Sequence, residues 1–190
     1  MAASVLRDVR EVTPRRGLSP IEAAWLAERQ AKRLLDLFEI TEPPVPDLVF
    51  ETLPRIQVRY VDDIPQEGGV AGAAAWIGGH WVMLINDGQA STRKRWTTCH
   101  ELKHVLDHPF IDYLYPETKT MDSSRRKERA ADGFAAALLI PRMWLKRDYF
   151  DAGIQDHRTL TKRYGVSGEA MNIRLRELGV IPQPLKRCAA

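Results

Sequence analysis

The hydrophobic period of this 190-residue chain changes near residue 90, and that change limits the fold more than any other feature of the sequence. Before it, RIQVRYV alternates apolar residues from Ile56 to Tyr60, as a half-buried strand does. GVAGAAAWIGGHWVMLIND then places two apolar runs around Gly78-Gly79, a pattern typical of a β-hairpin. After Ser91 the apolar spacing becomes helical. The sequence therefore predicts an α+β fold that is mainly helical and contains a small antiparallel sheet.

A further helix is predicted before the sheet, in SPIEAAWLAERQAKRLLDLFEI. Ser19 suits the N-cap of this helix and Pro20 suits its first turn, while apolar residues recur from Ile21 to Phe38. The proline-rich TEPPVP ends it. We therefore expect a helix laid against the sheet in the first half of the chain.

Three segments are expected along the chain. Residues 1–18 show no periodicity, so we predict a loosely ordered N-terminal arm. Residues 19–152 form the predicted core. Residues 153–190 are expected to form a segment that resembles a helix-turn-helix and packs on that core, with a hinge at Gly165-Val166 and Ser167 as an N-cap.

Composition favours a cytoplasmic protein. The 28 Lys and Arg residues against 25 Asp and Glu residues give a net charge of +3, far from the concentrated basicity of a dedicated nucleic-acid binder. Cys99 and Cys188 form neither a disulfide framework nor a paired-cysteine metal motif. The N-terminus has no apolar core, and the longest apolar run, FAAALLI, is too short to cross a bilayer. We expect no membrane partner.

The segment WTTCHELKHVLDH, Trp96 to His108, carries the strongest chemical signal. On a helix, residues four apart share a face with Cβ atoms about 5–6 Å apart, so His100 and His104 can direct two imidazoles at one ion. Glu101 lies about 100° round the helix, where it can reach a metal-bound water without being a ligand. The alternative is an amphipathic helix with two ordinary histidines.

A catalytic zinc site needs a third protein ligand and an open position. His108 continues the four-residue spacing, but on an unbroken helix it lies about 12 Å along the axis from His100, too far to share one ion. The extended metzincin pattern is excluded because Asp107 and Phe110 occupy the places of its glycine and third histidine.

Glu128 in KERAADGFAAALLIP is the remaining candidate ligand. Glu128 and Asp132 extend the face of a regular apolar stripe that runs from Ala131 to Leu139. A carboxylate on a buried stripe is costly unless it is paired or holds a metal, so we predict Glu128 as the third ligand. Asp132 is placed to accept the second ring hydrogen of a ligating histidine. The alternative is that both carboxylates lie on a solvent edge beside the basic residues of 125–129.

RWTTCHELKH followed by ERAADGFAAALLIP resembles the ImmA/IrrE family of zinc metallopeptidases. In that family a His-Glu-x-x-His helix precedes a helix of the type Glu-x-x-Ala-(Asn/Asp)-x-Phe-Ala, closed by Leu-Leu-x-Pro. The proline-rich break, the sheet ending in VMLIND and the C-terminal YGVSGEAMNIRLRELGV follow the same order, so the resemblance covers about Ile21 to Val180.

The resemblance implies one Zn²⁺ per chain and a role for each motif residue. It implies that the zinc lowers the pKa of a bound water while the catalytic base passes the water's proton to the leaving amine. The residues that would stabilise the oxyanion are not identified by it; His80, His157, Tyr113 and Tyr115 are candidates. The implied ligands are His100, His104 and Glu128, with Glu101 as catalytic base and Asp132 as the hydrogen-bond partner of a ligand.

The family acts inside bacterial cells on a helix-turn-helix repressor or antitoxin. The resemblance implies that this chain cleaves or inactivates such a regulator, so that a stress-response or mobile-element operon is expressed. Two residues depart from the family pattern. Lys103 replaces a glycine and is expected to place a charge near the site, and Cys99 replaces an alanine and is expected to be a small buried residue.

The competing hypothesis is a regulator that does not cut peptides. TLTKRYGVSGEAMNIRLREL resembles a DNA-binding helix-turn-helix whose second helix carries Asn172, Arg174 and Arg176. Against direct DNA binding, the apolar stripe of Met171, Leu175 and Leu178 requires a core. A module that captures a repressor or antitoxin without cutting it is a third hypothesis, which the retention of Glu101 argues against.

Overall fold

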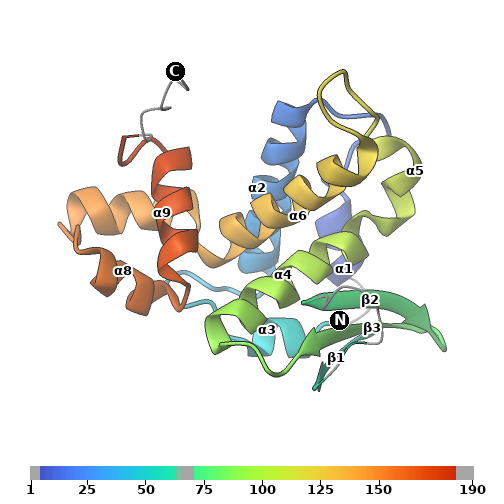
Figure 1. Ribbon diagram of the computed structural model, residues 1–190, viewed down its shortest axis with the longest axis horizontal. Coiled ribbons are helices and arrows are strands. Elements are labelled where there is room, and N and C mark those ends of the chain that lie inside the picture. The colour runs from blue at the N-terminus through green and yellow to red at the C-terminus, as the bar shows by residue number, and fades with distance from the viewer. Residues whose placement is uncertain (1–4, 63, 65–70, 183–190) are drawn as a thin grey trace, which may run out of the picture.

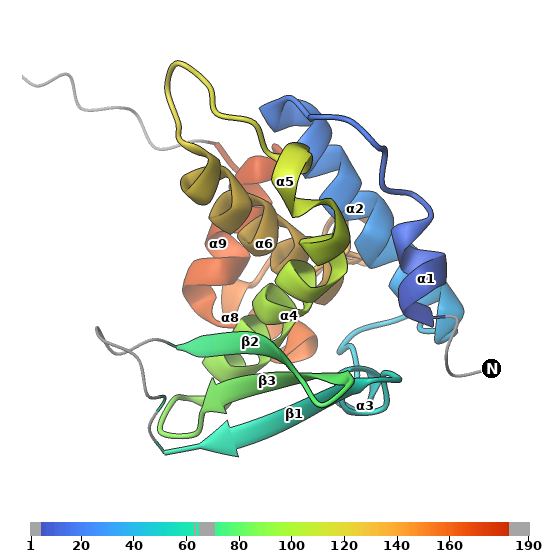
Figure 2. The same ribbon diagram turned by 90° about the vertical axis from the view of Figure 1, so that its right-hand side faces the viewer.

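The structure is a computed structural model that describes residues 5–62, 64 and 71–182. Helices make up most of it, and a three-stranded sheet covers one side of the helical part (Figures 1 and 2). The mainly helical α+β class predicted from the sequence is confirmed. The helical elements are α1 (Val5–Arg10), α2 (Pro20–Leu37), α3 (Leu48–Glu51), α4 (Ser91–Asp107), η1 (His108–Phe110), α5 (Ile111–Leu114), α6 (Ser123–Leu139), α7 (Arg142–Lys146), η2 (Arg147–Asp151), α8 (His157–Tyr164) and α9 (Gly168–Glu177).

The sheet is mixed, which corrects the prediction of a wholly antiparallel sheet. Strand β3 (His80–Asn86) lies between β1 (Ile56–Val61) and β2 (Gly72–Ile77), and it is antiparallel to β2 but parallel to β1. Gly78 and Gly79 form the predicted hairpin turn with positive φ angles of 57° and 85°. Because β3 is inserted between its hairpin partner and β1, the outer edge of β2 pairs with no strand in the part of the chain that the structure describes. Alternation identified the faces of these strands but carried no information about their order.

Helices α2, α4 and α6 enclose the main core. Helix α6 packs against both α2 and α4, and α4 also contacts β2 and β3. Leu34, Leu102 and Phe134, one from each helix, are almost completely buried. Burying a large apolar side chain in this way stabilises the folded state by roughly 1.5–3 kcal/mol. The predicted cap of α2 is confirmed, because the Ser19 side chain accepts a hydrogen bond from the Glu22 amide.

The N-terminal arm is more ordered than predicted. Although residues 1–4 lie outside the described part of the chain, Val5–Arg10 forms helix α1 and buries Leu6 and Val9. Arg10 donates hydrogen bonds to the carbonyls of Val105 and Leu106, which lie in the unsatisfied last turn of α4. The expectation of a loose arm was wrong because this six-residue helix gains its order from tertiary contacts and is too short to show a period.

The C-terminal helix pair packs on the core as far as residue 182, where the described part of the chain ends. Gly165 takes the left-handed conformation between α8 and α9, with φ of 63°, and Ser167 caps α9 as predicted. Met171 and Leu175 are buried. Arg174 is also buried and donates to the carbonyl of Ile140 and to the carboxylate of Glu28. No helix in the described ranges is long and apolar enough to cross a membrane.

A buried polar cluster fixes the side of α4 that faces α2. Lys103 is 1% exposed, and its Nζ donates to Gln30 Oε1 at 2.6 Å and to Asp107 Oδ1 at 2.8 Å. Tyr115 donates to the other oxygen of Asp107. Burial lowers the pKa of Lys103, while the charge and hydrogen bond of Asp107 counteract that effect. The charge of Lys103 is therefore compensated on the α2 side of α4, and its ammonium group does not line the cleft. As the sequence led us to expect, this charge still lies near the site: after burial and the charge of His100, it helps to lower the pKa of His104.

Replacing Lys103 with alanine leaves the buried Asp107 carboxylate without its cation. We expect Lys103→Ala to lower the free energy of unfolding by about 3–5 kcal/mol, the usual cost of breaking a buried ion pair from one side. Urea denaturation measures it. Lys32→Ala is the matched control, because Lys32 and Asp36 form the same four-residue pair at 2.6 Å with side chains 75% and 51% exposed. The control should cost less than about 1 kcal/mol. Equal losses in the two variants would contradict this account of the cluster.

Candidate metal centre

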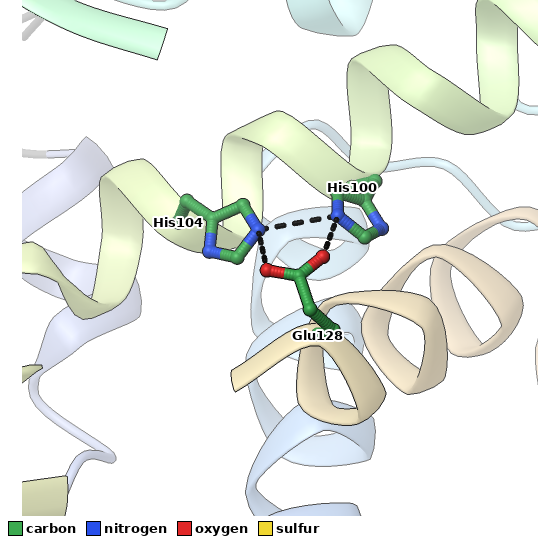
Figure 3. Close-up of side chains that lie close together, drawn as sticks. All are labelled: His100, His104 and Glu128. Carbon is green, nitrogen blue, oxygen red and sulfur yellow. Dashed lines mark hydrogen bonds and ion pairs between the residues drawn. The ribbon is translucent and has the colours of Figure 1, made fainter. Parts of the chain in front are cut away.

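His100 and His104 lie one turn apart on the face of α4 that is directed toward α6 (Figure 3). Their ring centroids are 4.9 Å apart. The two Nε2 atoms are only 3.1 Å apart, so both imidazoles direct the same ring nitrogen at one point. The predicted helical register therefore brings the two histidines together.

Glu128 reaches the same point from α6. Its Oε2 lies 3.2 Å from His100 Nε2, and its Oε1 lies 3.5 Å from His104 Nε2. The ligand atoms of the three residues all lie within 4.8 Å of one another. A tetrahedral zinc ion with bonds of about 2.0–2.2 Å holds its ligand atoms roughly 3.3 Å apart. The separations and the chemistry of these donors therefore fit a zinc ion.

Asp132 holds the outer nitrogen of His100. Its Oδ1 lies 3.0 Å from His100 Nδ1 and accepts a second hydrogen bond from Trp96 Nε1 at 3.3 Å. With its proton on Nδ1, His100 presents the Nε2 lone pair to the cluster. Burial lowers the pKa of His100, but Asp132, Glu101 and Glu128 together outweigh it and raise the pKa. A proton therefore competes with a metal ion for this histidine.

The two carboxylates are exposed, contrary to the argument that placed Glu128 and Asp132 on a buried stripe. Their side chains are 56% and 58% exposed. The apolar stripe is buried from Ala131 onward, whereas Glu128 and Asp132 border an open cleft. The alternative of a solvent edge is thus partly right, but both carboxylates point across the cleft at α4 instead of away from it.

Glu101 lies at the floor of the cleft, next to His100. It is only 8% exposed. Burial raises the pKa of Glu101 to about 7, while the charge of His100 lowers it and that of Glu128 raises it. The carboxyl group can therefore take up and release a proton near neutral pH, as a general base requires.

Strand β2 approaches α4 so closely at Glu101 that only glycine fits. A Cβ atom on Gly72 would lie 2.4 Å from Thr97 Cγ2 and 3.0 Å from Glu101 Oε1. Sequence reasoning missed this contact. The available signal was a glycine followed by three alanines in a strand, a composition that permits close backbone approach.

The cleft that contains the cluster has a volume of about 540 Å³. Its walls come from the start of β2, from α4 and from the first turns of α6. Arg93, an exposed residue one turn before Trp96, was also missed by sequence reasoning and lines its outer part. The lining residues are Ala71, Gly72, Ala73, Ala74, Arg93, Trp96, Thr97, His100, Glu101, His104, Glu128 and Asp132.

The four residues considered as oxyanion donors lie outside this lining. Tyr115 is buried against Asp107. The ring of His157 interacts with the carbonyl of Gly168 at 3.0 Å, and that of His80 with the carbonyl of Gly78 at 3.4 Å. Tyr113 packs its ring against Phe110. The cleft thus gives no support to any of these candidates.

His108 and Cys99, which the sequence also singled out, do not line the cleft. His108 follows the last residue of α4 and packs against Trp81, with ring centroids 4.8 Å apart. Cys99 is fully buried, and burial raises the pKa of its thiol well above the ordinary value. It is the small buried residue that was expected. Cys188 lies outside the described residues.

Comparisons with known proteins found a family model and a solved structure that this chain resembles. The model of the peptidase family described as the IrrE N-terminal-like domain matches residues 50–176, which is more than half of the chain. Among solved structures, a Mycobacterium tuberculosis transcriptional regulator is similar with a TM-score of 0.61 and 16% sequence identity. The similarity covers 90% of this chain but only 51% of that regulator, so this chain spans about half of its length. No curated protein matches the sequence.

Metal affinity should fall in a graded way when the cluster is altered. Glu128→Ala should abolish stoichiometric zinc binding because it removes a ligand. Asp132→Ala should weaken binding by about 10- to 100-fold, because His100 loses the acceptor that orients it. Competition with a fluorescent chelator measures both. Glu169→Ala, which removes an exposed carboxylate of α9, is the control and should bind like the wild type. Full zinc occupancy in Glu128→Ala would refute its assignment as a ligand.

The raised pKa of Glu101 predicts a pH-dependent stability difference in the metal-free protein. Its pKa rises from 4.5 to about 7 on folding, so the unfolded chain loses this proton first and stability falls as the pH rises through that window. Glu101→Gln cannot ionise. It should exceed the wild type in unfolding free energy by about 3 kcal/mol at pH 8, and this gain should vanish near pH 4. Urea denaturation with chelator measures the difference, and a gain of equal size at both pH values would contradict the assignment.

Proposed function

The chain belongs to the peptidase family of the IrrE N-terminal-like domain, and on that premise we propose that it is a zinc-dependent endopeptidase. One observation carries the proposal: His100, His104 and Glu128 converge on one point, and the buried carboxyl group of Glu101 lies beside them. Two imidazoles and a carboxylate leave a tetrahedral position open, as a catalytic zinc site requires.

The roles of the residues follow from their positions. Zinc bound at this site would activate a water molecule and polarise the scissile carbonyl. Glu101 takes the proton of the attacking water and delivers it to the leaving amine, because its carboxylate borders the cluster without belonging to it. Asp132 keeps the proton of His100 on Nδ1 throughout. The three ligands and Asp132 thus hold the site while Glu101 moves the proton.

An extended peptide segment is the substrate that the cleft fits best. Among the described residues no strand pairs with the outer edge of β2, whose first residues line the cleft together with Glu101. An extended chain can add to such an edge as a further strand. The alanines at 73 and 74 leave room for it. A cleft of about 540 Å³ accommodates a strand and not a folded domain. We infer that the cut lies in a segment that is extended or can become so.

We further propose that the substrate is a helix-turn-helix repressor or antitoxin in the cytoplasm. Membership of the family supports a regulatory role, and the similar solved structure is that of a transcriptional regulator. Cleavage or inactivation of such a protein would derepress a stress-response or mobile-element operon. The chemistry proposed for the cleft does not depend on this identification.

Direct DNA binding by α9 is less well supported. Met171 and Leu175 are buried, and Arg174 is held at the carbonyl of Ile140 and at Glu28, so this arginine is not presented to a DNA groove. A module that binds a regulator without cutting it remains the stronger alternative. Removing the general base distinguishes that module from a peptidase.

Glu101→Gln should keep the metal and lose proteolysis. We expect wild-type zinc occupancy with a loss of cleavage of about 10²- to 10⁴-fold, the usual contribution of a general base. The variant serves as a trap in a pull-down from the native host, and the captured protein is then incubated with wild-type enzyme with and without chelator. Glu169→Gln is the control and should cut like the wild type.

A captured helix-turn-helix regulator that is cut only when metal is present would agree with the proposal. If the captured protein stays whole under all conditions, the chain is a binding module. If DNA is captured instead, the regulatory alternative is correct and the role given to Glu101 is wrong.

A further inference from the structure

We propose that Trp76, backed by Trp81 and His108, forms a subsite for a large apolar side chain of the substrate. The inference rests on the proposed function, because it assigns a preference to the peptide that adds to β2. It concerns the stretch of β2 beyond the alanines that line the metal cleft.

Trp76 lies on the face of β2 that is directed toward α4. Alternate residues of a strand share a face, so Gly72, Ala74 and Trp76 point the same way. Gly72 identifies that face, because a Cβ atom added to it would meet Thr97 and Glu101. Figure 2 shows β2 beside α4, and the two elements are in contact. The ring of Trp76 therefore continues the wall that begins at the general base.

A row of aromatic rings connects Trp76 to the end of α4. The ring centroids of Trp76 and its cross-strand partner Trp81 lie 5.6 Å apart, with the planes at 67°. Trp81 in turn lies 4.8 Å from the ring of His108, with the planes at 71°. His108 is one helical turn, about 6 Å, beyond the ligand His104. The row thus runs from Trp76 to the end of α4, one turn past the metal cluster.

Both ends of this row, Trp76 and His108, are open to solvent, and only Trp81 between them is buried. Trp81 is 8% exposed, whereas Trp76 is 52% exposed. Trp76 belongs to β2, whose outer edge pairs with no other described strand, so a chain adding to that edge would pass beside it. An exposed aromatic ring continuous with a binding cleft suits an apolar partner group.

The spacing along the strand identifies the substrate residue involved. In an added strand, the residue beside Trp76 and the residue beside Ala74 are two positions apart, about 7 Å. Ala74 lines the metal cleft and Trp76 lies beyond it. The side chain held by Trp76 is therefore that of a residue two or three positions from the scissile bond. Phenylalanine, tryptophan, leucine and methionine have the size and apolar surface to cover the exposed ring.

A randomised nonapeptide library tests the subsite. Zinc-loaded wild-type protein should cut peptides enriched in large apolar residues at one position, two or three residues from the cut, by roughly tenfold over alanine there. Trp76→Ala should lose this enrichment. Trp76→Thr, which retains strand propensity, should lose it too, and Trp76→Phe should keep most of it.

Two control variants remove comparable exposed side chains elsewhere. Trp25→Ala removes a 65% exposed tryptophan from α2, and Ile77→Ala removes a 56% exposed residue from the opposite face of β2. Both should retain the wild-type enrichment. Circular dichroism confirms that each variant is folded.

The same library passed over immobilised, zinc-loaded Glu101→Gln protein separates this inference from the proposed function. Cleavage without enrichment, or enrichment unchanged in both Trp76→Ala and Trp76→Thr, overturns the subsite and leaves the peptidase standing. Captured peptides that carry the enrichment but are not cut by the wild type support the subsite and overturn the peptidase. If peptides are neither captured nor cut, both are overturned.

Discussion

The packing of α6 against α4 is the contact on which the candidate site depends. Buried apolar side chains such as Leu102 and Phe134 fix the distance between the two helices, and that distance brings Glu128 within 3.2–3.5 Å of the histidine Nε2 atoms. A displacement of about 1 Å in this contact would spoil the spacing that a metal ion requires. The core therefore fixes the spacing of the two helices, and the sides of α4 and α6 that line the cleft supply the donor atoms.

Three faces of helix α4 contact three different parts of the molecule. The histidines face the cleft, Leu102 faces the core, and Lys103 faces the polar cluster that ties α4 to α2. Gly72 adds a fourth constraint by allowing β2 to touch α4 at the general base. Metal ligands, base and peptide-binding edge are thereby held on one helix and its direct neighbours, which favours a preorganised site.

Local signals in the sequence predicted what depends on local geometry. The four-residue spacing of His100 and His104 placed them on one face, and Gly78-Gly79 predicted the hairpin turn. The resemblance to a known family identified Glu128 as the partner across the cleft. Glu128 was also expected as a ligand because a buried carboxylate needs a partner, but its carboxylate is in fact exposed.

Features set by tertiary contacts could not be predicted from the pattern. The parallel pairing of β1 depends on which strand β3 meets, and helix α1 depends on the carbonyls that Arg10 finds at the end of α4. The burial of Lys103 in a polar cluster could not be predicted because one of its two partners, Gln30, lies 73 positions away in the chain. The close approach at Gly72 likewise joins elements that the sequence separates.

The central claim is that two histidines and one glutamate hold a single zinc ion. X-ray absorption at the zinc edge on the metal-loaded, full-length protein tests it most directly, because it reports the type and number of ligands without reference to activity. The account predicts one zinc per chain, two imidazole ligands and otherwise only oxygen, at about 2.0–2.2 Å. A sulfur ligand at about 2.3 Å, a single imidazole, or well under one zinc per chain would contradict it.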